Sequence, residues 1–300
     1  MFDFDELEEK YEAKRAPKEP KKATVPKPKA AQAAQAAQAA ETKPKAAPRS
    51  NGSPAPMNRK IRVLALHGGG SNANIMQFQV MPLRRILGDQ AEWVFLNGGR
   101  TWKFDEGQQP PEIMKTLAAG MPFYGWYAVE TKDKTDRPYQ EKLFDPEVDF
   151  TYTEVEAGVD RVLAYIKDEG PVDVLVGFSQ GCIVSHLMAA VLRERGEAIP
   201  WRLSIFFNGM RVRDRRYERL FQTALELPSI MVFGRQIQRI QDEFYNYGKA
   251  SQMALYQEPL VLEHDEGHKF PSAGPRAKEI YEEVAKQVYF HCGVAPRNKI

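Results

Sequence analysis

One segment determines how this chain folds: Val172-Asp173-Val174-Leu175-Val176-Gly177-Phe178-Ser179-Gln180-Gly181. It is an apolar run that ends in a G-x-S-x-G motif, and apolar residues at helical spacing follow it, namely Ile183, Val184, Leu187, Met188, Val191 and Leu192. A strand, a tight turn and a helix in this order form a nucleophile elbow, in which the two glycines prevent side-chain collisions. The sequence therefore predicts that Ser179 has a strained backbone conformation and faces the free N–H groups that begin a helix.

Strand and helix patterns alternate through most of the chain. The expected strands are 61–66, 93–96, 172–176, 203–207, 230–233 and 260–262, and the expected helices are 75–87, 155–166, 180–192, 214–225, 243–257 and 277–291. This alternation predicts an α/β fold with a mostly parallel, doubly wound sheet. Loops at the carboxyl ends of the strands should then share one edge, which would bring together His67, Ser179, Gly234 and His264.

The composition changes near residue 60. Residues 13–60 carry twelve Lys or Arg against two acids, hold eight prolines and include an Ala/Gln tract from Ala30 to Ala40. Because this stretch has almost no large apolar residue, it cannot bury a core. We therefore expect residues 1–60 to be a disordered extension, acidic and then basic, and residues 61–295 to form one domain.

The first twelve residues are acidic, with Phe2, Phe4, Leu7 and Tyr11 interleaved. This pattern is typical either of a short helix that docks on a protein partner or of an inert, solvated terminus. The following basic stretch is interpreted as a solubilising tether, although weak contact with RNA or an acidic membrane is an alternative.

Charge and cysteine content limit the class of protein. The chain has a net charge of +2, of which residues 1–60 contribute +5 and the remainder −3. A folded part without a basic surplus argues against nucleic-acid binding. No apolar run is long enough for a membrane span, and the acidic N-terminus lacks the features of a signal or transit peptide. With only Cys182 and Cys292, no disulfide framework is implied, so we expect a cytoplasmic protein.

A serine nucleophile needs a histidine that accepts its proton, and His268 is the best candidate. It follows the last expected strand, which is where this fold class places its histidine. His264 competes but belongs to the strand end, and His186 and His291 fall on helices. The pair His264 and His268 does not fit a zinc site of the H-E-x-x-H type, which needs a helix, so no metal or organic cofactor is expected.

The oxyanion of the reaction needs two backbone donors. The N–H of Gln180, directly after the serine, is one candidate. The other is the N–H of Gly69 in His67-Gly68-Gly69-Gly70, the loop after the first strand, where glycines let the backbone approach a substrate.

The acid that orients the histidine should follow the strand at 230–233. The first carboxylate there is Asp242. It either reaches His268 through an extra loop or merely caps the next helix, as Asp often does. Both interpretations stay open.

The folded part resembles the FSH family of serine hydrolases, which are small α/β-hydrolases. The resemblance covers about residues 61–290 and is carried by Leu66-His67-Gly68, by the segment Gly170 to Gly181, and by His264-x-x-Gly267-His268-x-x-Pro271. It implies Ser179 as nucleophile and His268 as base. The family's acid usually comes three residues after the glycine that ends its strand, and that position is Ile237 here. Either an insertion moves the acid to Asp242, or the triad is incomplete.

We therefore expect a serine hydrolase of the carboxylesterase or thioesterase type that works through an acyl-enzyme at Ser179. The aromatic section between residues 100 and 150 either lines the acyl pocket, through Trp102, Tyr124 and Trp126, or is ordinary core. The alternative is a catalytically impaired pseudo-hydrolase that binds a small molecule or a protein. The sequence does not separate an ester from a thioester substrate.

Overall fold

The computed structural model describes residues 57–104, 109–137, 142, 145, 147–235, 249–272 and 274–297. Within them, six strands form one sheet in the order β10-β9-β8-β7-β1-β2, and every pair of neighbours is parallel. Their bounds are β1 Ile61–Leu66, β2 Ala91–Leu96, β7 Val174–Phe178, β8 Leu203–Phe207, β9 Ser229–Gly234 and β10 Leu260–His264. The expectation of a parallel, doubly wound α/β sheet is confirmed.

The order of the strands reverses between β1 and β7. From β1 the chain moves outward to β2 on one side, and it then returns to β7 and continues through β8 and β9 to β10 on the other. Loops leave the carboxyl ends of β1 and β7 in opposite directions, so they open a crevice between them. The topology therefore places a binding site at the ends of these two strands.

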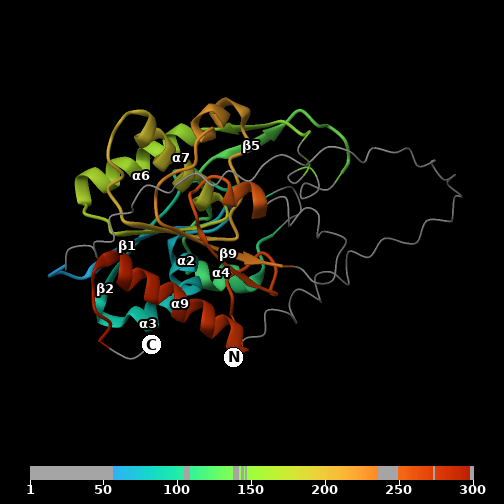
Figure 1. Ribbon diagram of the computed structural model, residues 1–300. Helices are drawn as coiled ribbons and strands as arrows, with labels where there is room; N and C mark the ends of the chain where they lie inside the picture. The colour runs from blue at the N-terminus through green and yellow to red at the C-terminus, as the bar shows by residue number, and fades with distance from the viewer. Residues whose placement is uncertain are drawn as a thin grey trace, which may run out of the picture. The chain divides into compact units, whose positions relative to one another are not determined.

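Helices cover both faces of the sheet (Figure 1). On one face lie α6 Val155–Glu169 and α7 Gln180–Glu194, and on the other lie α2 Ala73–Gln79, α3 Met81–Leu87 and α9 Gly274–Cys292. The strands alternate between the two cores: Leu64 and Leu66 pack toward α6 and α7, whereas Val63 and Ala65 pack toward α3 and α9. This period of two along a parallel strand buries both faces of the sheet.

Two expected helices were wrong in detail. The pattern at 75–87 forms α2 and α3 separately, because Pro82 lacks an N–H and its ring excludes a continuous helix, so a new helix begins there. The charged segment expected as a helix at 214–225 is a 3-10 helix, η2 Arg215–Phe221. Its start is fixed by the Asp214 carboxylate, which accepts hydrogen bonds from the N–H groups of Arg216 and Tyr152.

The helix expected at 243–257 is only partly described. Residues 249–253 are helical, and residues 236–248 lie outside the described residues. The remaining expected elements are confirmed with shifts of a few residues at their ends, which is the usual uncertainty of helix and strand boundaries.

The section between residues 100 and 153 forms small antiparallel pairs and one helix. β3 Arg100–Thr101 pairs with β4 Tyr124–Gly125, and β5 Ala128–Thr131 pairs with β6 Phe150–Thr153. Between β3 and β4 lies α4 Glu112–Ala118, and η1 Gly88–Gln90 precedes β2. These pairs extend from the carboxyl edge of the sheet and supply part of the site described below.

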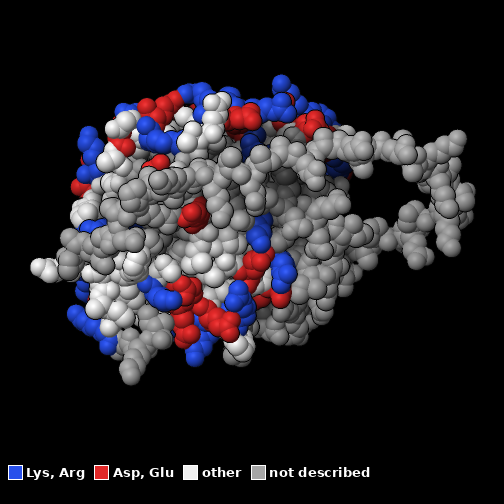
Figure 2. All heavy atoms as spheres, in the orientation of Figure 1, with Lys and Arg blue, Asp and Glu red and all other residues white. Residues whose placement is uncertain are grey.

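Basic and acidic side chains are interspersed on the face of the molecule shown in Figure 2. On α9, for example, ion pairs join Arg276 to Glu279 and Lys278 to Glu282. No helix in the part of the chain that the structure describes is both long and apolar enough to cross a membrane.

Candidate active site

Ser179 lies in the turn between β7 and α7. Its φ of 49° and ψ of −112° are rare for a residue with a side chain. The flanking glycines make the turn possible, since a Cβ on Gly181 would lie 2.3 Å from the Leu66 carbonyl oxygen. A Cβ on Gly177 would lie 2.9 Å from the Cys182 amide nitrogen. The turn therefore packs directly against the end of β1 and the first turn of α7, as the motif predicts.

The loop after β1 packs against this turn. A Cβ on Gly68 would lie 2.8 Å from the Phe178 ring and 3.3 Å from Ser179 Cβ, and a Cβ on Gly69 would lie 2.8 Å from Gln180 Cδ. A side chain at either position would displace the Phe178 ring or the Gln180 side chain, so the glycines let this loop lie close to the turn. The structure therefore brings together Ser179, Gly69 and Gln180, which the sequence assigned to nucleophilic attack and to oxyanion binding.

The side chain of Gln180 has a role that the sequence did not reveal. Its Oε1 accepts a hydrogen bond from the Trp126 N–H at 3.1 Å, and its Nε2 donates to the Tyr127 carbonyl at 3.5 Å. The Trp126 indole in turn donates to the His67 carbonyl at 2.7 Å. These bonds fix the segment before β5 against the elbow, so the residue that follows Ser179 holds one wall of the pocket in place.

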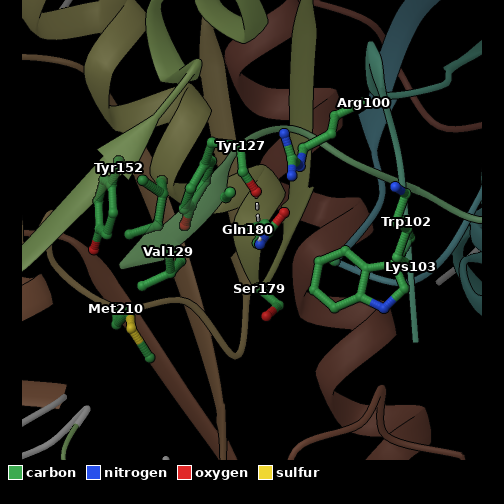
Figure 3. A pocket seen from close by; sticks show the side chains of 12 residues that line it. Arg100, Trp102, Lys103, Tyr127, Val129, Tyr152, Ser179, Gln180 and Met210 are labelled. Carbon is green, nitrogen blue, oxygen red and sulfur yellow. Dashed lines mark hydrogen bonds between the residues drawn. The ribbon is translucent and has the colours of Figure 1, made fainter. Parts of the chain in front are cut away.

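A pocket of about 600 Å³ opens at Ser179 (Figure 3). Its apolar lining comes from β5, β6, α7 and the loop after β8, and consists of Tyr127, Ala128, Val129, Tyr152, Ile183 and Met210. Arg100, Trp102 and Lys103, on β3 and the residues after it, line the other side together with Gly69 and Gln180. Ser179 therefore lines a pocket in which apolar side chains are combined with polar and basic ones, and such a combination is typical of sites that bind small organic ligands.

The three aromatic residues suggested for the pocket occupy different places. Trp102 lines it, with its indole packed over the backbone of Gly69 and Gly70. Trp126 is buried, and its ring lies 5.2 Å from that of His67. Tyr124 belongs to β4 and is not one of the lining residues, and its backbone bonds hold the loop after β1 at Ser71.

His268 lies beside the elbow, in the loop after β10. Its ring centroid is 5.3 Å from that of Phe178, the residue immediately before Ser179. The loop is fixed to the end of β9, because the Gly267 N–H donates to the Arg235 carbonyl at 3.1 Å. Of the histidines that the sequence offered, His268 is thus brought next to the nucleophile turn.

His264, the competing histidine, is buried at the end of β10 and lies away from the pocket. It ends β10 with 2% of its surface exposed, and its Nδ1 accepts a hydrogen bond from the Glu266 N–H at 3.3 Å. Burial lowers the pKa of His264. A Cβ on Gly234 would lie 2.8 Å from its ring, so the side chain is wedged beside the end of β9 and does not line the pocket.

Comparison with known proteins identifies the family. The family model described as Serine hydrolase (FSH1) matches residues 57–280, which include the elbow, the loop after β1 and His268. The chain belongs to the FSH1 family of serine hydrolases. It is 28% identical over 226 residues to Esterase C25G4.2 of Caenorhabditis elegans, across 74% of this chain and 91% of the relative. To Esterase OVCA2 of Danio rerio it is 24% identical over 233 residues, across 76% and 97%.

Among solved structures, the crystal structure of Arabidopsis thaliana SOBER1 is similar to this FSH1-family chain at 16% sequence identity. The match covers 76% of this chain and 99% of the SOBER1 chain, with a TM-score of 0.48.

Asn208 holds the histidine loop of this serine hydrolase in place. It follows β8 with a left-handed φ of 47°, and 7% of its surface is exposed. Its Nδ2 donates to the Lys269 carbonyl at 2.5 Å, and its Oδ1 accepts from the Gly234 N–H at 2.7 Å. One amide thus connects the end of β8, the end of β9 and the residue after His268. The only sequence signal was the pair Asn208-Gly209, which is typical of a turn.

The catalytic acid of this FSH1-family chain stays a prediction. Asp242 and the alternative position Ile237 both lie outside the described residues. The described chain after β9 ends at Arg235, whose N–H donates to the His264 carbonyl at 2.7 Å. Arg235, the last described residue before this gap, is therefore bonded to the segment from His264 to Gly267.

His67 stabilises the loop that carries Gly69. Its Nε2 accepts a hydrogen bond from the Gly98 N–H at 3.0 Å, so its Nδ1 carries the proton and donates to the Gly68 carbonyl at 2.7 Å. Burial lowers the pKa of His67 to about 4, so the ring is neutral at physiological pH. This histidine connects the loops after β1 and β2 and is fully occupied by backbone partners.

Proposed function

We propose that this chain hydrolyses carboxylic esters or thioesters through an acyl-enzyme formed on Ser179. The observation that carries the proposal is the strained turn at Ser179, which faces the pocket between Gly69 and Gln180. A residue with a side chain adopts this conformation only when the surrounding structure imposes it, and such strain clusters at functional sites. Membership of the FSH1 serine hydrolases and the two relatives named esterases support hydrolysis.

In the proposed reaction, Ser179 Oγ attacks the substrate carbonyl carbon and His268 accepts the hydroxyl proton. The backbone N–H groups of Gly69 and Gln180 donate to the oxygen on which negative charge develops. The N-terminal end of α7 points at the same centre and favours that charge. His268 then returns the proton to the departing alcohol or thiol as the acyl–oxygen or acyl–sulfur bond breaks.

Water completes the cycle. His268 removes a proton from water, the resulting hydroxide adds to the acyl carbon, and the carboxylic acid leaves as Ser179 regains its proton. Asp242 is proposed to orient the imidazole and to stabilise its protonated form. An ester and a thioester differ only in the leaving atom, so the same residues serve both.

Fluorophosphonate labelling tests this proposal, because the probe reacts only with an activated serine. The purified full chain is treated with the probe, and the adduct is read by intact mass for the wild type, Ser179→Ala and Asp242→Ala. Ser229→Ala is the control, since this serine lies at the start of β9, at the opposite edge of the sheet. We expect labelling of the wild type and of Ser229→Ala and none of Ser179→Ala.

The Asp242→Ala variant decides the acid. Loss of the acid lowers the rate of such a triad by several orders of magnitude, so the labelling rate should fall sharply. Unchanged labelling would show that Asp242 is not the acid. A wild type that forms no adduct would overturn the proposed hydrolysis and favour a pseudo-hydrolase that only binds its ligand.

A further inference from the structure

One side of the pocket is cationic. Arg100 and Lys103 lie there beside Trp102, and none of the described residues that line the pocket is an Asp or a Glu. Figure 3 shows these three residues on one side of Ser179, with Val129, Tyr152 and Met210 on the other. The nucleophile therefore separates a positively charged side from an apolar side.

The two cations, Arg100 and Lys103, differ in whether an acidic side chain already pairs with them. Arg100 forms an ion pair with Glu154 at 2.9 Å, which offsets part of its charge. Lys103 is exposed and makes no hydrogen bond or ion pair with any described residue. Asp105 and Glu106 follow it in the sequence and lie outside the described residues, so the experiment below reverses the charge of Lys103 itself. Of the two cations that line the pocket, Lys103 is therefore the one without an acidic partner among the described residues.

The apolar side suits the acyl part of a substrate. Val129, Ile183 and Met210 present hydrocarbon surface there, and an apolar acyl chain gains most by leaving water at such a surface. With the acyl chain on that side and the carbonyl carbon at Ser179, the alcohol or thiol part extends toward Trp102 and Lys103. A cation at that position attracts negative charge and steers a charged substrate into the pocket.

We propose that the substrate carries a negatively charged group, such as a phosphate, sulfonate or carboxylate, on its alcohol or thiol part, and that Lys103 binds this group with help from Arg100. The inference rests on the proposed hydrolysis at Ser179 and specifies its substrate class. It assigns the two sides of the pocket, one to an apolar acyl chain and the other to an anionic leaving group.

Three hexanoate or adipate esters test the proposal. Phenyl hexanoate is neutral, 4-sulfophenyl hexanoate carries its charge on the leaving group, and monophenyl adipate carries its charge on the acyl group. The value of kcat/KM is measured for each with the wild type, Lys103→Gln, Lys103→Glu and Lys278→Gln. Lys278 is the control, an exposed lysine on α9 that pairs with Glu282. For each enzyme, the ratio of kcat/KM for two esters is calculated, and this ratio is compared between enzymes. The intrinsic reactivity of the esters is the same for every enzyme and therefore cancels.

We expect the ratio of 4-sulfophenyl to phenyl hexanoate to fall about fivefold in Lys103→Gln, as for a partly exposed charge pair, and further in Lys103→Glu. Added salt should lower the wild-type ratio toward that of Lys103→Gln, and Lys278→Gln should keep the wild-type ratio. An unchanged ratio in Lys103→Glu overturns the proposal. A ratio that responds to Lys103 only for monophenyl adipate also overturns it, because the anion would then belong to the acyl side.

The neutral ester, phenyl hexanoate, distinguishes failure of the proposed hydrolysis from failure of the proposed charge preference. If phenyl hexanoate is hydrolysed and Ser179→Ala abolishes the reaction, the hydrolase stands and only the charge preference is at issue. If the wild type hydrolyses none of the three esters, both proposals fail.

Discussion

Single residues at the carboxyl edge of the sheet fix the geometry of the site. Ser179 is held in its strained conformation, Gln180 fastens the wall through Trp126, and Asn208 fastens the histidine loop through Lys269. Asn208 suits its position for two reasons. Its backbone is left-handed, which asparagine tolerates better than most residues, and its amide supplies both a donor and an acceptor.

Asn208 is therefore expected to act on the reaction through the position of His268. Asn208→Ala removes both side-chain hydrogen bonds, and Asn208→Asp keeps the acceptor for Gly234 but turns an oxygen toward the Lys269 carbonyl. We expect kcat for an ester to fall about tenfold to a hundredfold in both variants, since a small displacement of a catalytic group has an effect of this size. The value of KM should change little, because Asn208 does not line the pocket. Lower thermal stability with an unchanged kcat would contradict this positioning role.

At the scale of elements, the elbow is a packing junction of β1, β7 and α7. Gly181 is the contact point, because a Cβ on it would lie 2.3 Å from the Leu66 carbonyl oxygen and 3.0 Å from that of His67. Gly99 offers a comparison, since a Cβ there would meet nothing nearer than Arg161 Cδ at 3.7 Å and its φ is not positive. Gly181 is the second residue of α7 and Gly99 lies between β2 and β3, and of the two only Gly181 would bring an added Cβ against backbone atoms.

Gly181→Ala should therefore lower the free energy of unfolding by about 2–3 kcal/mol, the cost of overpacking against backbone that cannot move aside. Gly99→Ala should change it by less than about 1 kcal/mol, because the new methyl group meets only ordinary contacts. Urea denaturation of the two variants beside the wild type measures the difference. Equal stability of the two variants would show that the elbow does not pack as tightly as described.

The elements of this fold were predictable where local pattern decides the structure. β1 and β7 are apolar runs that end at glycines, and their alternation with helices implied a parallel sheet. The prediction was wrong at Pro82, where the apolar stripe is continuous in the sequence but the helix is interrupted. It was also wrong at 215–221, where a hydrogen bond from the Tyr152 N–H to the Asp214 carboxylate fixes the start of a 3-10 helix. That Ser179, Gly69 and Gln180 lie together could be predicted because backbone chemistry constrains their motif.

The side-chain contacts that hold the site together could not be predicted from the sequence. The bonds of Asn208 to Lys269 and of Gln180 to Trp126 join segments that are 61 and 54 residues apart, and no local spacing reveals such partners. The charged side of the pocket depends on how β3 is placed beside the elbow, which the irregular section between residues 100 and 150 did not show. The acid at Asp242 stays a prediction.

At the scale of the whole molecule, two buried histidines connect stability to pH. Burial lowers the pKa of His67 to about 4 and that of His186 to about 3. His186 lies on α7 and is buried in the protein core, and its Nδ1 is 2.9 Å from the Tyr256 hydroxyl. In the unfolded chain both rings titrate near a pKa of about 6.5. At a pH between the pKa of a buried ring and that of the same ring in the unfolded chain, the unfolded chain binds a proton that the folded chain does not.

The free energy of unfolding should therefore be highest above pH 6.5 and should fall as the pH is lowered from 6.5 toward 4. Each buried histidine contributes a slope of up to about 1.4 kcal/mol per pH unit in that window. Replacing one of them, as in His186→Phe, should reduce the slope by about that amount. Urea denaturation between pH 6.5 and 4.5 measures both slopes. If the free energy of unfolding of the wild type and of His186→Phe depended on pH with the same slope, burial of His186 would not be a source of the pH dependence.

The acyl-enzyme on Ser179 is the central claim, and trapping it is the most direct test. The full chain is mixed with phenyl hexanoate, quenched in acid within the first turnover, and analysed by intact mass and peptide mapping, with Ser179→Ala treated in parallel. We predict a mass increase equal to one hexanoyl group, located on the peptide that contains Ser179 and absent from the variant. Release of phenol from the wild type without any acyl adduct, or an adduct that persists in Ser179→Ala, would contradict the mechanism.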